Sequence, residues 1–366
     1  MGTQFCVESL GDNEFNKRTL CVVEAALLII STGVWYGYVR ENSHQNEYQA
    51  LDLYCNPVQD TTANNSAKDS CQDQFRDRIP SQQQLKFYNN TDQIFYNRMP
   101  KCGSEMTMTL LRNVAKKNHW TYPPENKRIW TITKQGHQYW VDNEKVLKEI
   151  SHLTMDHKKP MLFSCHLYYT DFSRLWSKKS LPTYINIIRN PQDRLISLYY
   201  YFRFHPVQRR KKMPIALRKM TYDTCVRMEL PECTAPNPEG FWTMVPYFCG
   251  HDPICRTPSR DALDRAKANI VSNYAVIGLT EDMETFTRVL ENVIPKYFRG
   301  MTDLYRQMAK NYKASVNKNT YHKVEPLQET LKIMKPRLRL EVEFYEFVKS
   351  RFYSLVEYLK CQGIEI

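Results

Sequence analysis

The amino-acid sequence predicts an α/β domain with a central parallel sheet flanked by helices, placed after a membrane-spanning helix and a polar stem. The first observation is that short apolar runs alternate with helical patterns, which favours a parallel sheet. The second is one apolar run of membrane-spanning length near the N-terminus, and the third is the polar stretch that follows it. We expect strands at Ile94–Tyr96, Met161–Cys165, Tyr184–Ile188 and Ala275–Leu279.

Residues 20–39 form the apolar run, which is broken only by Glu24 and has aromatic side chains at one end. We interpret it as an uncleaved signal-anchor, and a cleaved signal peptide is the alternative. This assigns residues 1–19 to a cytosolic tail. Residues 40–85 are polar and poor in aliphatic side chains, so we assign them to a luminal stem and residues 86–366 to a catalytic domain.

The compartment follows from the cysteines and two glycosylation sequons, at Asn64 and Asn89. Together with the apolar run they place most of the chain in the secretory lumen. The expected plan is a single-pass type II protein of the Golgi membrane, which is common among glycan-modifying enzymes. The formal net charge of +12 predicts a polyanionic partner, for which we expect a glycan and no nucleic acid.

The segment YNRMPKCGSEMT, residues 96–107, predicts a strand, a tight loop and the start of a helix. A helix N-terminus offers backbone N–H groups to an anion, and Lys101 adds a positive charge. The order of residues differs from the Walker A pattern, in which the lysine comes last. The alternative is an ordinary turn with a solvated lysine.

The segment TYINIIRNPQDRLISLYYYF, residues 183–202, predicts a second strand-to-helix junction. Asn190 suits the N-cap and Pro191 the first helical position. Arg189 would stand at the tip of the strand, where a guanidinium can bind a phosphate, and Ser197 lies about two turns into the helix. The alternative is a solvated arginine and a serine on the helix surface.

These two segments, with FSCHLYYTDF at residues 163–172, resemble the glycosaminoglycan 2-O-sulfotransferases, which include heparan sulfate and uronyl 2-O-sulfotransferases and Pipe. PYFCGHDPIC, EFYEF and YFRG add matches outside the catalytic motifs. The resemblance implies the sulfotransferase fold, which is P-loop-like, and the sulfuryl donor 3′-phosphoadenosine 5′-phosphosulfate (PAPS). KCGS looks nearer to the uronyl and Pipe branch than to the heparan branch.

The resemblance also implies roles for particular residues. Those expected to contact the donor are Lys101, Cys102, Gly103, Ser104, Arg189, Ser197, Ser315, Thr320 and Lys323. Those expected to contact the sugar are Arg98 and Arg203. His166 would be the general base that takes the proton of the sugar hydroxyl, while Lys101 would stabilise the transferred group. A packed histidine at a strand end is the alternative for His166.

The implied acceptor is the 2-hydroxyl of a uronic acid in a glycosaminoglycan or a related glycan, and the resemblance also implies a homotrimer. A dense basic run would line the groove that binds this acceptor: Arg209, Arg210, Lys211, Lys212, Arg218 and Lys219. The alternative is a solvated loop. The scheme needs no metal, and no Cys/His spacing indicates zinc.

Two local disulfides are implied by the same resemblance, Cys225–Cys233 and Cys249–Cys255. Cys55 and Cys71 are expected to pair within the stem. Cys102, Cys165 and Cys361 then remain, and the sequence does not choose between packing and a reactive thiol for them.

One departure from the family pattern is Glu105, a carboxylate beside the expected diphosphate site. It keeps open a second function, a catalytically weak glycan-binding paralogue of the same fold. A Golgi glycosyltransferase is a third hypothesis, but the chain contains no D-x-D triplet of the kind that holds a metal and a nucleotide sugar.

Overall fold

The computed structural model describes the domain that follows the predicted membrane span and most of the stem. The residues described are 71, 73–123, 147–148, 150–152, 157–174, 176–177, 181–204, 214–230, 232–234, 243–315 and 323–366. Among these, no helix combines the length and the apolar character needed to cross a bilayer. The predicted span at 20–39 lies outside the described residues, so it stays a prediction.

Four parallel strands form one sheet in the order β2-β1-β3-β4. Their bounds are Gln93–Asn97 for β1, Met161–Cys165 for β2, Thr183–Ile188 for β3 and Tyr274–Leu279 for β4. Each predicted strand is confirmed to within one or two residues. Every residue of β1, β3 and β4 is buried, as expected for a parallel sheet covered on both faces.

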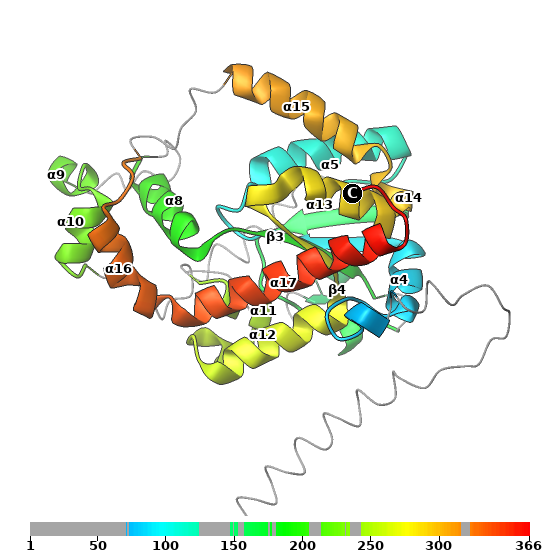
Figure 1. The fold of residues 1–366 in the computed structure, drawn as a ribbon, viewed down its shortest axis with the longest axis horizontal. Coiled ribbons are helices and arrows are strands. Elements are labelled where there is room, and N and C mark those ends of the chain that lie inside the picture. The colour runs from blue at the N-terminus through cyan, green and yellow to red at the C-terminus, as the bar shows by residue number, and fades with distance from the viewer. Residues whose placement is uncertain are drawn as a thin grey trace, which may run out of the picture. The chain divides into compact units, whose positions relative to one another are not determined.

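Helices surround the sheet on all sides that Figure 1 shows. Before β4 and its preceding helix they are α4 (Gln82–Asn89), α5 (Ser104–Asn118), α8 (Pro191–Phe204), α9 (Ile215–Arg218), α10 (Tyr222–Arg227) and α11 (Val245–Cys249). The later ones are α12 (Arg260–Asn273), α13 (Met283–Val293), α14 (Pro295–Phe298), α15 (Met301–Ser315), α16 (Gln328–Arg337) and α17 (Arg339–Cys361). Short 3₁₀ turns occupy Phe172–Arg174, Pro253–Arg256 and Thr280–Asp282.

The register of the sheet stacks aromatic side chains in its centre. Phe95 of β1 pairs with Phe163 of β2 on one side and Tyr184 of β3 on the other. The ring centroids lie 4.4 Å apart for Phe95 and Phe163, and 5.1 Å apart for Phe95 and Tyr184. Each such pair adds about 1 kcal/mol to the stabilisation from buried area.

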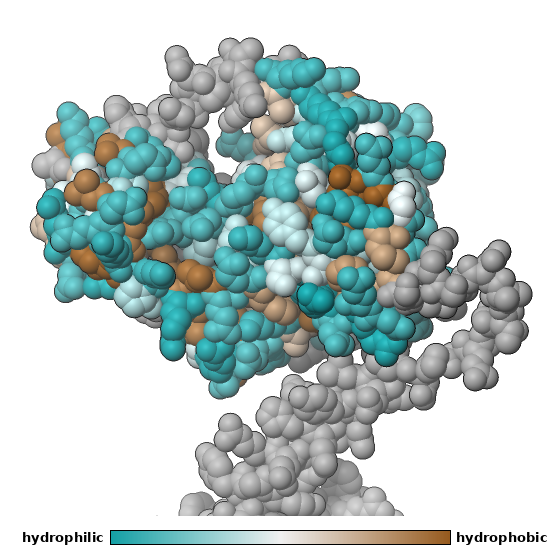
Figure 2. All heavy atoms as spheres, viewed as in Figure 1, coloured by the Kyte–Doolittle hydropathy of each residue, from teal (hydrophilic) through white to brown (hydrophobic). Residues whose placement is uncertain are grey.

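A second, smaller core lies beside the main one, between α8, α10 and α16. These helices gather with α9 at the left of Figure 1. Apolar side chains remain exposed there, and Figure 2 shows them as brown patches over α9 and α10, among them Ile215, Leu217 and Met228. The last residues of β3 lead directly into α8, so this cluster is joined to the sheet through the strand-to-helix junction predicted at Asn190.

The cysteine pairing corrects one prediction. Cys71 is bonded to Cys361 at the end of α17, across 290 residues, so the expected Cys55–Cys71 pair is wrong. Cys55 lies outside the described residues. The two short-range pairs, Cys225–Cys233 and Cys249–Cys255, are both bonded.

The folded domain also begins earlier than residue 86. Cys71 and Ile79 are 4% exposed and belong to the main core. Ser81 caps α4 by accepting the backbone N–H of Gln84, whose side chain accepts the N–H of Ser81 in return. Cys71, Ile79 and Pro80 are therefore buried within a segment that the sequence assigned to a solvated stem.

Candidate functional site

The carboxyl ends of all four strands meet at one edge of the sheet, because the strands are parallel. β1 leads into the loop that holds Lys101, and β2 is followed at once by His166. β3 is followed by Arg189 and β4 by Thr280. Open α/β sheets bind ligands at this edge, so the two junctions singled out in the sequence and the candidate base converge there.

The loop after β1 has a strained and open backbone. Lys101 and Gly103 both have positive φ, 65° and 68°. Gly103 is exposed and forms the N-cap of α5, so no side chain caps the first N–H groups of that helix. A β-carbon at this position would lie 3.0 Å from Cγ2 of Thr280. The loop therefore presents uncapped helix N–H groups to an anion, and a larger residue at Gly103 would crowd Thr280.

Lys101 is half-buried and rests on an aromatic ring of α8. Its Nζ lies 4.1 Å from the centroid of the Tyr201 ring. Burial lowers the pKa of Lys101 to about 8, the charge of Glu105 opposes this and the charge of Arg189 adds to it. The ammonium group is thus largely protonated at neutral pH and is held by a weak contact that an anion can replace.

Contacts between the loop and α8 bring the two predicted phosphate segments together. Arg194, which is 1% exposed, donates from Nε to the carbonyl of Pro100 at 3.1 Å. Asn190 caps α8 as predicted, accepting the backbone N–H groups of Gln192 and Asp193. The N–H of Asn190 itself donates to Glu281 Oε1, just beyond β4, at 2.7 Å.

Two residues expected to contact the donor are buried. Ser197 is 3% exposed on α8, and Cys102 is fully buried in the loop. Burial raises the pKa of the Cys102 thiol to about 11, although the charges of Arg194 and Arg189 oppose the shift. The thiol is therefore protonated and shielded, which argues for packing over a reactive role.

His166 has a defined protonation state at the end of β2. Its Nδ1 donates a hydrogen bond to the backbone carbonyl of Arg98 at 2.7 Å, because a carbonyl oxygen can only accept. Burial and the charge of Arg98 lower the pKa of His166 to about 3, and the bond to the carbonyl partly opposes them. The imidazole is thus neutral at physiological pH, with its proton on Nδ1 and a lone pair on Nε2.

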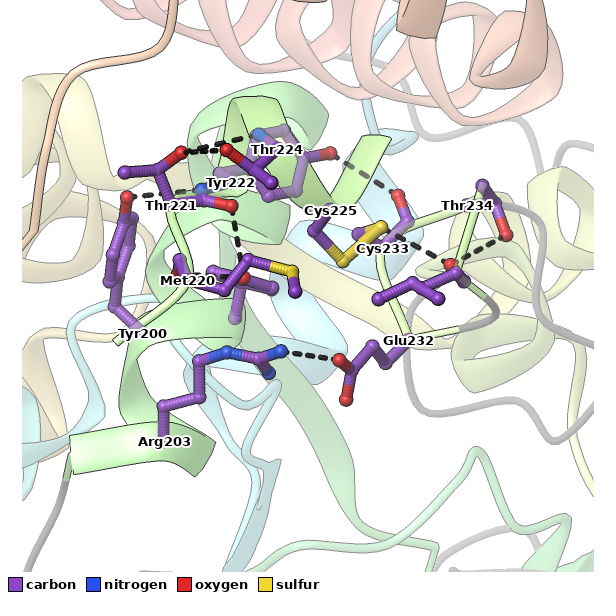
Figure 3. The surroundings of a disulfide bond; sticks show 12 residues. Tyr200, Arg203, Met220, Thr221, Tyr222, Thr224, Cys225, Glu232, Cys233 and Thr234 are labelled. Atoms are coloured by element: carbon purple, nitrogen blue, oxygen red, sulfur yellow. Dashed lines mark hydrogen bonds and ion pairs between the residues drawn. A yellow bond between two sulfur atoms is a disulfide. The ribbon is translucent and has the colours of Figure 1, made fainter. Parts of the chain in front are cut away.

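The two arginines predicted to contact sugar both lie inside the domain. Arg98 is 5% exposed and its guanidinium packs on the sulfur of Met108. Arg203 is 3% exposed, forms an ion pair with Glu232 and lies 4.0 Å from the centroid of the Tyr199 ring. Figure 3 shows Arg203 pointing at Glu232, one residue before the Cys225–Cys233 bridge. Neither guanidinium faces an open surface.

Some of the other predicted residues are described, and the others lie outside the described part of the chain. Lys323 forms an ion pair with Glu325 at 2.6 Å, and Ser315 is the last residue of α15. Asn89 is exposed at the end of α4. The predicted residues that lie outside the described part of the chain are Asn64, Arg209, Arg210, Lys211, Lys212 and Thr320. No group of His, Cys, Asp and Glu in the described part is arranged to hold a metal ion.

Comparison with known proteins decides the family. A model of the sulfotransferase family matches residues 85–348. The chain belongs to this family. It is 35% identical over 265 residues to heparan sulfate 2-O-sulfotransferase 1 of Mus musculus, an alignment that covers 71% of this chain and 70% of that protein. The same protein of Gallus gallus is 35% identical over 268 residues, with the same coverage.

The human uronyl 2-sulfotransferase is also similar, at 33% identity over 270 residues, which cover 72% of this chain and 63% of that protein. A sulfotransferase must hold a sulfuryl donor and deprotonate an acceptor. A lysine, an arginine and a histidine follow the strands at one edge of this sheet, and these residue types suit the two tasks.

Sequence reasoning missed several residues of this candidate site. Arg194, Tyr201, Tyr247 and Thr280 all contact the loop after β1 or its neighbours. Thr280 had a signal in the sequence, because it directly follows a predicted strand and strand ends carry the site. Tyr247 lies in PYFCGHDPIC, a segment that resembles the family but to which the resemblance gives no role. Nothing local in the sequence marks Arg194 or Tyr201.

Proposed function

We propose that this sulfotransferase moves the sulfuryl group of PAPS to the 2-hydroxyl of a uronic acid in a glycosaminoglycan or a related glycan. The observation that carries the proposal is the state of His166. It is neutral, with its Nδ1–H bonded to a backbone carbonyl, so the basic lone pair of the ring is on Nε2. A general base in that state, at the same sheet edge as a lysine on an anion-binding loop, matches the needs of sulfuryl transfer.

The residues at this edge fit a donor that carries several negative charges. The N–H groups at the start of α5 and the ammonium of Lys101 would hold the 5′-phosphosulfate, and Arg189 with Ser197 would hold the 3′-phosphate. When bound, the donor supplies an activated sulfuryl group. Lys101 would leave the ring of Tyr201 and offset the negative charge that develops on the bridging oxygen.

His166 would take the proton of the sugar hydroxyl through Nε2 as attack proceeds. With a pKa of about 3, the imidazole of the free protein is a weak base. Negative charges on the bound donor and on the acceptor would oppose the effect of Arg98 and raise that pKa toward neutrality, where general-base catalysis is most efficient.

The acceptor class rests on the relatives, whose names specify heparan sulfate and uronyl 2-O-sulfation. The two kinds of relative are nearly equally similar to this chain, at 35% and 33% identity. We therefore propose a uronic acid as the acceptor and leave its polymer to experiment. The basic run around Arg209 and Arg210 would supply the charges that a polymer with a carboxylate on every second sugar requires.

We further propose that the protein is a single-pass type II protein of the Golgi membrane, with this domain in the lumen, where it forms a homotrimer. The three disulfides in the described part of the chain support an oxidising compartment, and the exposed Asn89 supports glycosylation there. Sensitivity of the protein to an N-glycosidase, lost in Asn89→Gln and Asn64→Gln together, tests the placement, and sedimentation tests the trimer.

The decisive experiment offers labelled PAPS with desulfated dermatan, chondroitin and heparan in parallel. We expect label in at least one polymer, and its loss in Lys101→Ala and in His166→Ala. Lys116→Ala and His152→Ala are matched controls, since both side chains are exposed and lie away from the strand ends. Transfer that survives His166→Ala would refute the assignment of the base, and failure of a folded protein to bind PAPS would refute the proposed donor.

One observation favours the second candidate, a glycan-binding protein with weak catalysis. Glu105 is exposed in the first turn of α5, and its negative charge raises the pKa of Lys101, so it lies close enough to repel a diphosphate. If this reading holds, Glu105→Gln should tighten PAPS binding several-fold in a calorimetric titration. Strong transfer by the unaltered protein would remove the second candidate.

A further inference from the structure

The segment PYFCGHDPIC contributes a tyrosine to the surroundings of His166. Tyr247 lies on α11 and is 2% exposed. Its hydroxyl donates to the carbonyl of Arg98 at 2.6 Å, and this is the same oxygen that accepts the Nδ1–H of His166. One carbonyl oxygen thus receives two hydrogen bonds, one from the candidate base and one from a residue 81 positions further along the chain.

The geometry of that oxygen decides which nitrogen of His166 carries the proton. A carbonyl aimed at Nδ1 stabilises the tautomer with hydrogen on Nδ1 and repels the one with a lone pair there. The backbone N–H of Arg98 donates to the carbonyl of Cys165 at 2.8 Å, which fixes the peptide group before Arg98. The carbonyl of Arg98 belongs to the peptide group after it. The hydroxyl of Tyr247 fixes this following peptide group.

Tyr247 is itself held firmly by four other parts of the fold. Its backbone carbonyl accepts the N–H of Tyr169, three residues after His166, at 2.8 Å, and its ring packs edge-on against Tyr168 with centroids 4.9 Å apart. The carboxylate of Glu341, on α17, accepts the N–H groups of Met244 and Val245 at the start of α11. The Cys249–Cys255 bridge closes the other end of α11.

The side chain of Asn269, on α12, adds a further support by donating to the carbonyls of Phe248 and Cys249, each at 2.9 Å. Two long helices, a disulfide and the segment after β2 therefore converge on a five-residue helix. The side chain that this arrangement directs toward the sheet edge is the phenol of Tyr247, whose hydroxyl ends on the Arg98 carbonyl.

We infer that Tyr247 is a positioning residue for catalysis, whose hydroxyl fixes the Arg98 carbonyl and thereby holds His166 in the tautomer with hydrogen on Nδ1 and the basic lone pair on Nε2. The inference about catalysis rests on the proposed role of His166 as the base. The inference about the tautomer stands without it.

The test is Tyr247→Phe, which removes one oxygen and keeps the buried ring. We expect kcat to fall about tenfold, the factor that corresponds to about 1.4 kcal/mol and to the upper range for one neutral hydrogen bond, with both KM values within twofold. The second readout is the nitrogen NMR spectrum of protein labelled with ¹⁵N-histidine, in which the His166 signals are assigned by their loss in His166→Gln.

The unaltered protein should show a protonated Nδ1 and an unprotonated Nε2 on His166, and Tyr247→Phe should show a mixture of the two tautomers. The matched control is Tyr297→Phe. Its buried hydroxyl donates to the carbonyl of Met161 at 3.2 Å, at the opposite end of β2 from His166. This control should lose stability but keep the kcat and the His166 signals of the unaltered protein.

Each outcome has a distinct meaning. Unchanged His166 signals in Tyr247→Phe, with or without a loss of kcat, would overturn the inference, as would hydrogen on Nε2 in the unaltered protein. The latter measurement needs no variant, so it holds even if Tyr247→Phe fails to fold. A changed tautomer with unchanged kcat would leave the positioning of His166 standing and refute His166 as the base.

Discussion

We first predict how much stability the protein loses when the Cys71–Cys361 bridge is removed. The bridge closes a loop of 290 residues. In the chain-entropy description of disulfides, such a loop restricts the unfolded chain enough to stabilise the fold by about 6 kcal/mol at 25 °C. The Cys249–Cys255 bridge closes a loop of only 6 residues, for which the same relation gives about 2 kcal/mol.

The assay compares two double variants, Cys71→Ser with Cys361→Ser, and Cys249→Ser with Cys255→Ser. We expect the first to lose about 3.5 kcal/mol more of its free energy of unfolding in urea than the second. Cys71, Cys249 and Cys255 belong to the main core, whereas Cys361 is exposed, so lost packing is greater for the short bridge and an excess loss from the long bridge reports loop length. An equal loss, or a larger loss from the short bridge, would refute the reasoning and show that local packing governs both.

Four further predictions address the site and its supports. Burial raises the pKa of Glu341 from 4.5 to about 7, so the protonated side chain contributes about 3 kcal/mol to stability. This contribution is complete below pH 4.5 and is lost as the pH rises through 7. The melting temperature of Glu341→Gln should therefore depend less on pH between about 5 and 8 than that of the unaltered protein. The pKa of His166 is about 3, so kcat/KM, which reports the free protein, should show no loss near pH 6, where an unshifted histidine would produce one. Arg203→Ala should cost about 3 kcal/mol of stability, because it removes the ion pair with Glu232 and the packing of the guanidinium on Tyr199, with the acceptor KM unchanged; a selective rise in that KM would restore its predicted role as a sugar contact. Gly103→Ala should raise the KM for PAPS and lower stability by about 1–2 kcal/mol, because φ is 68° there and the new methyl group meets Thr280; an unchanged KM would contradict the role of this loop.

The strands and the two junctions could be predicted from sequence because their signals are local. A buried parallel strand is a short run of β-branched and aromatic residues, and each of the four runs became a strand. Asn190 and Pro191 mark the start of α8 by their own chemistry. Convergence of Lys101, His166 and Arg189 follows from one rule, that parallel strands end at the same edge.

The rest depended on contacts between distant residues. Cys71 and Cys361 lie 290 positions apart, and nothing near either residue distinguishes that pairing from Cys55–Cys71. The family resemblance implied a sugar contact for Arg203, but Glu232 and the adjoining bridge hold it inside the domain. The bond from Tyr247 to the Arg98 carbonyl is of the same kind, since it exists only once α11 is packed.

The strand order has a consequence for the order in which substrates bind. β2 and β3 lie on opposite sides of β1, and neighbouring strands are about 4.8 Å apart, so the ends that carry His166 and Arg189 are separated by about 10 Å with Lys101 between them. On the proposed function, the acceptor approaches from the β2 side and the nucleotide from the β3 side. On the same proposal, we expect this separation to let spent nucleotide leave and fresh donor enter while the polymer stays bound.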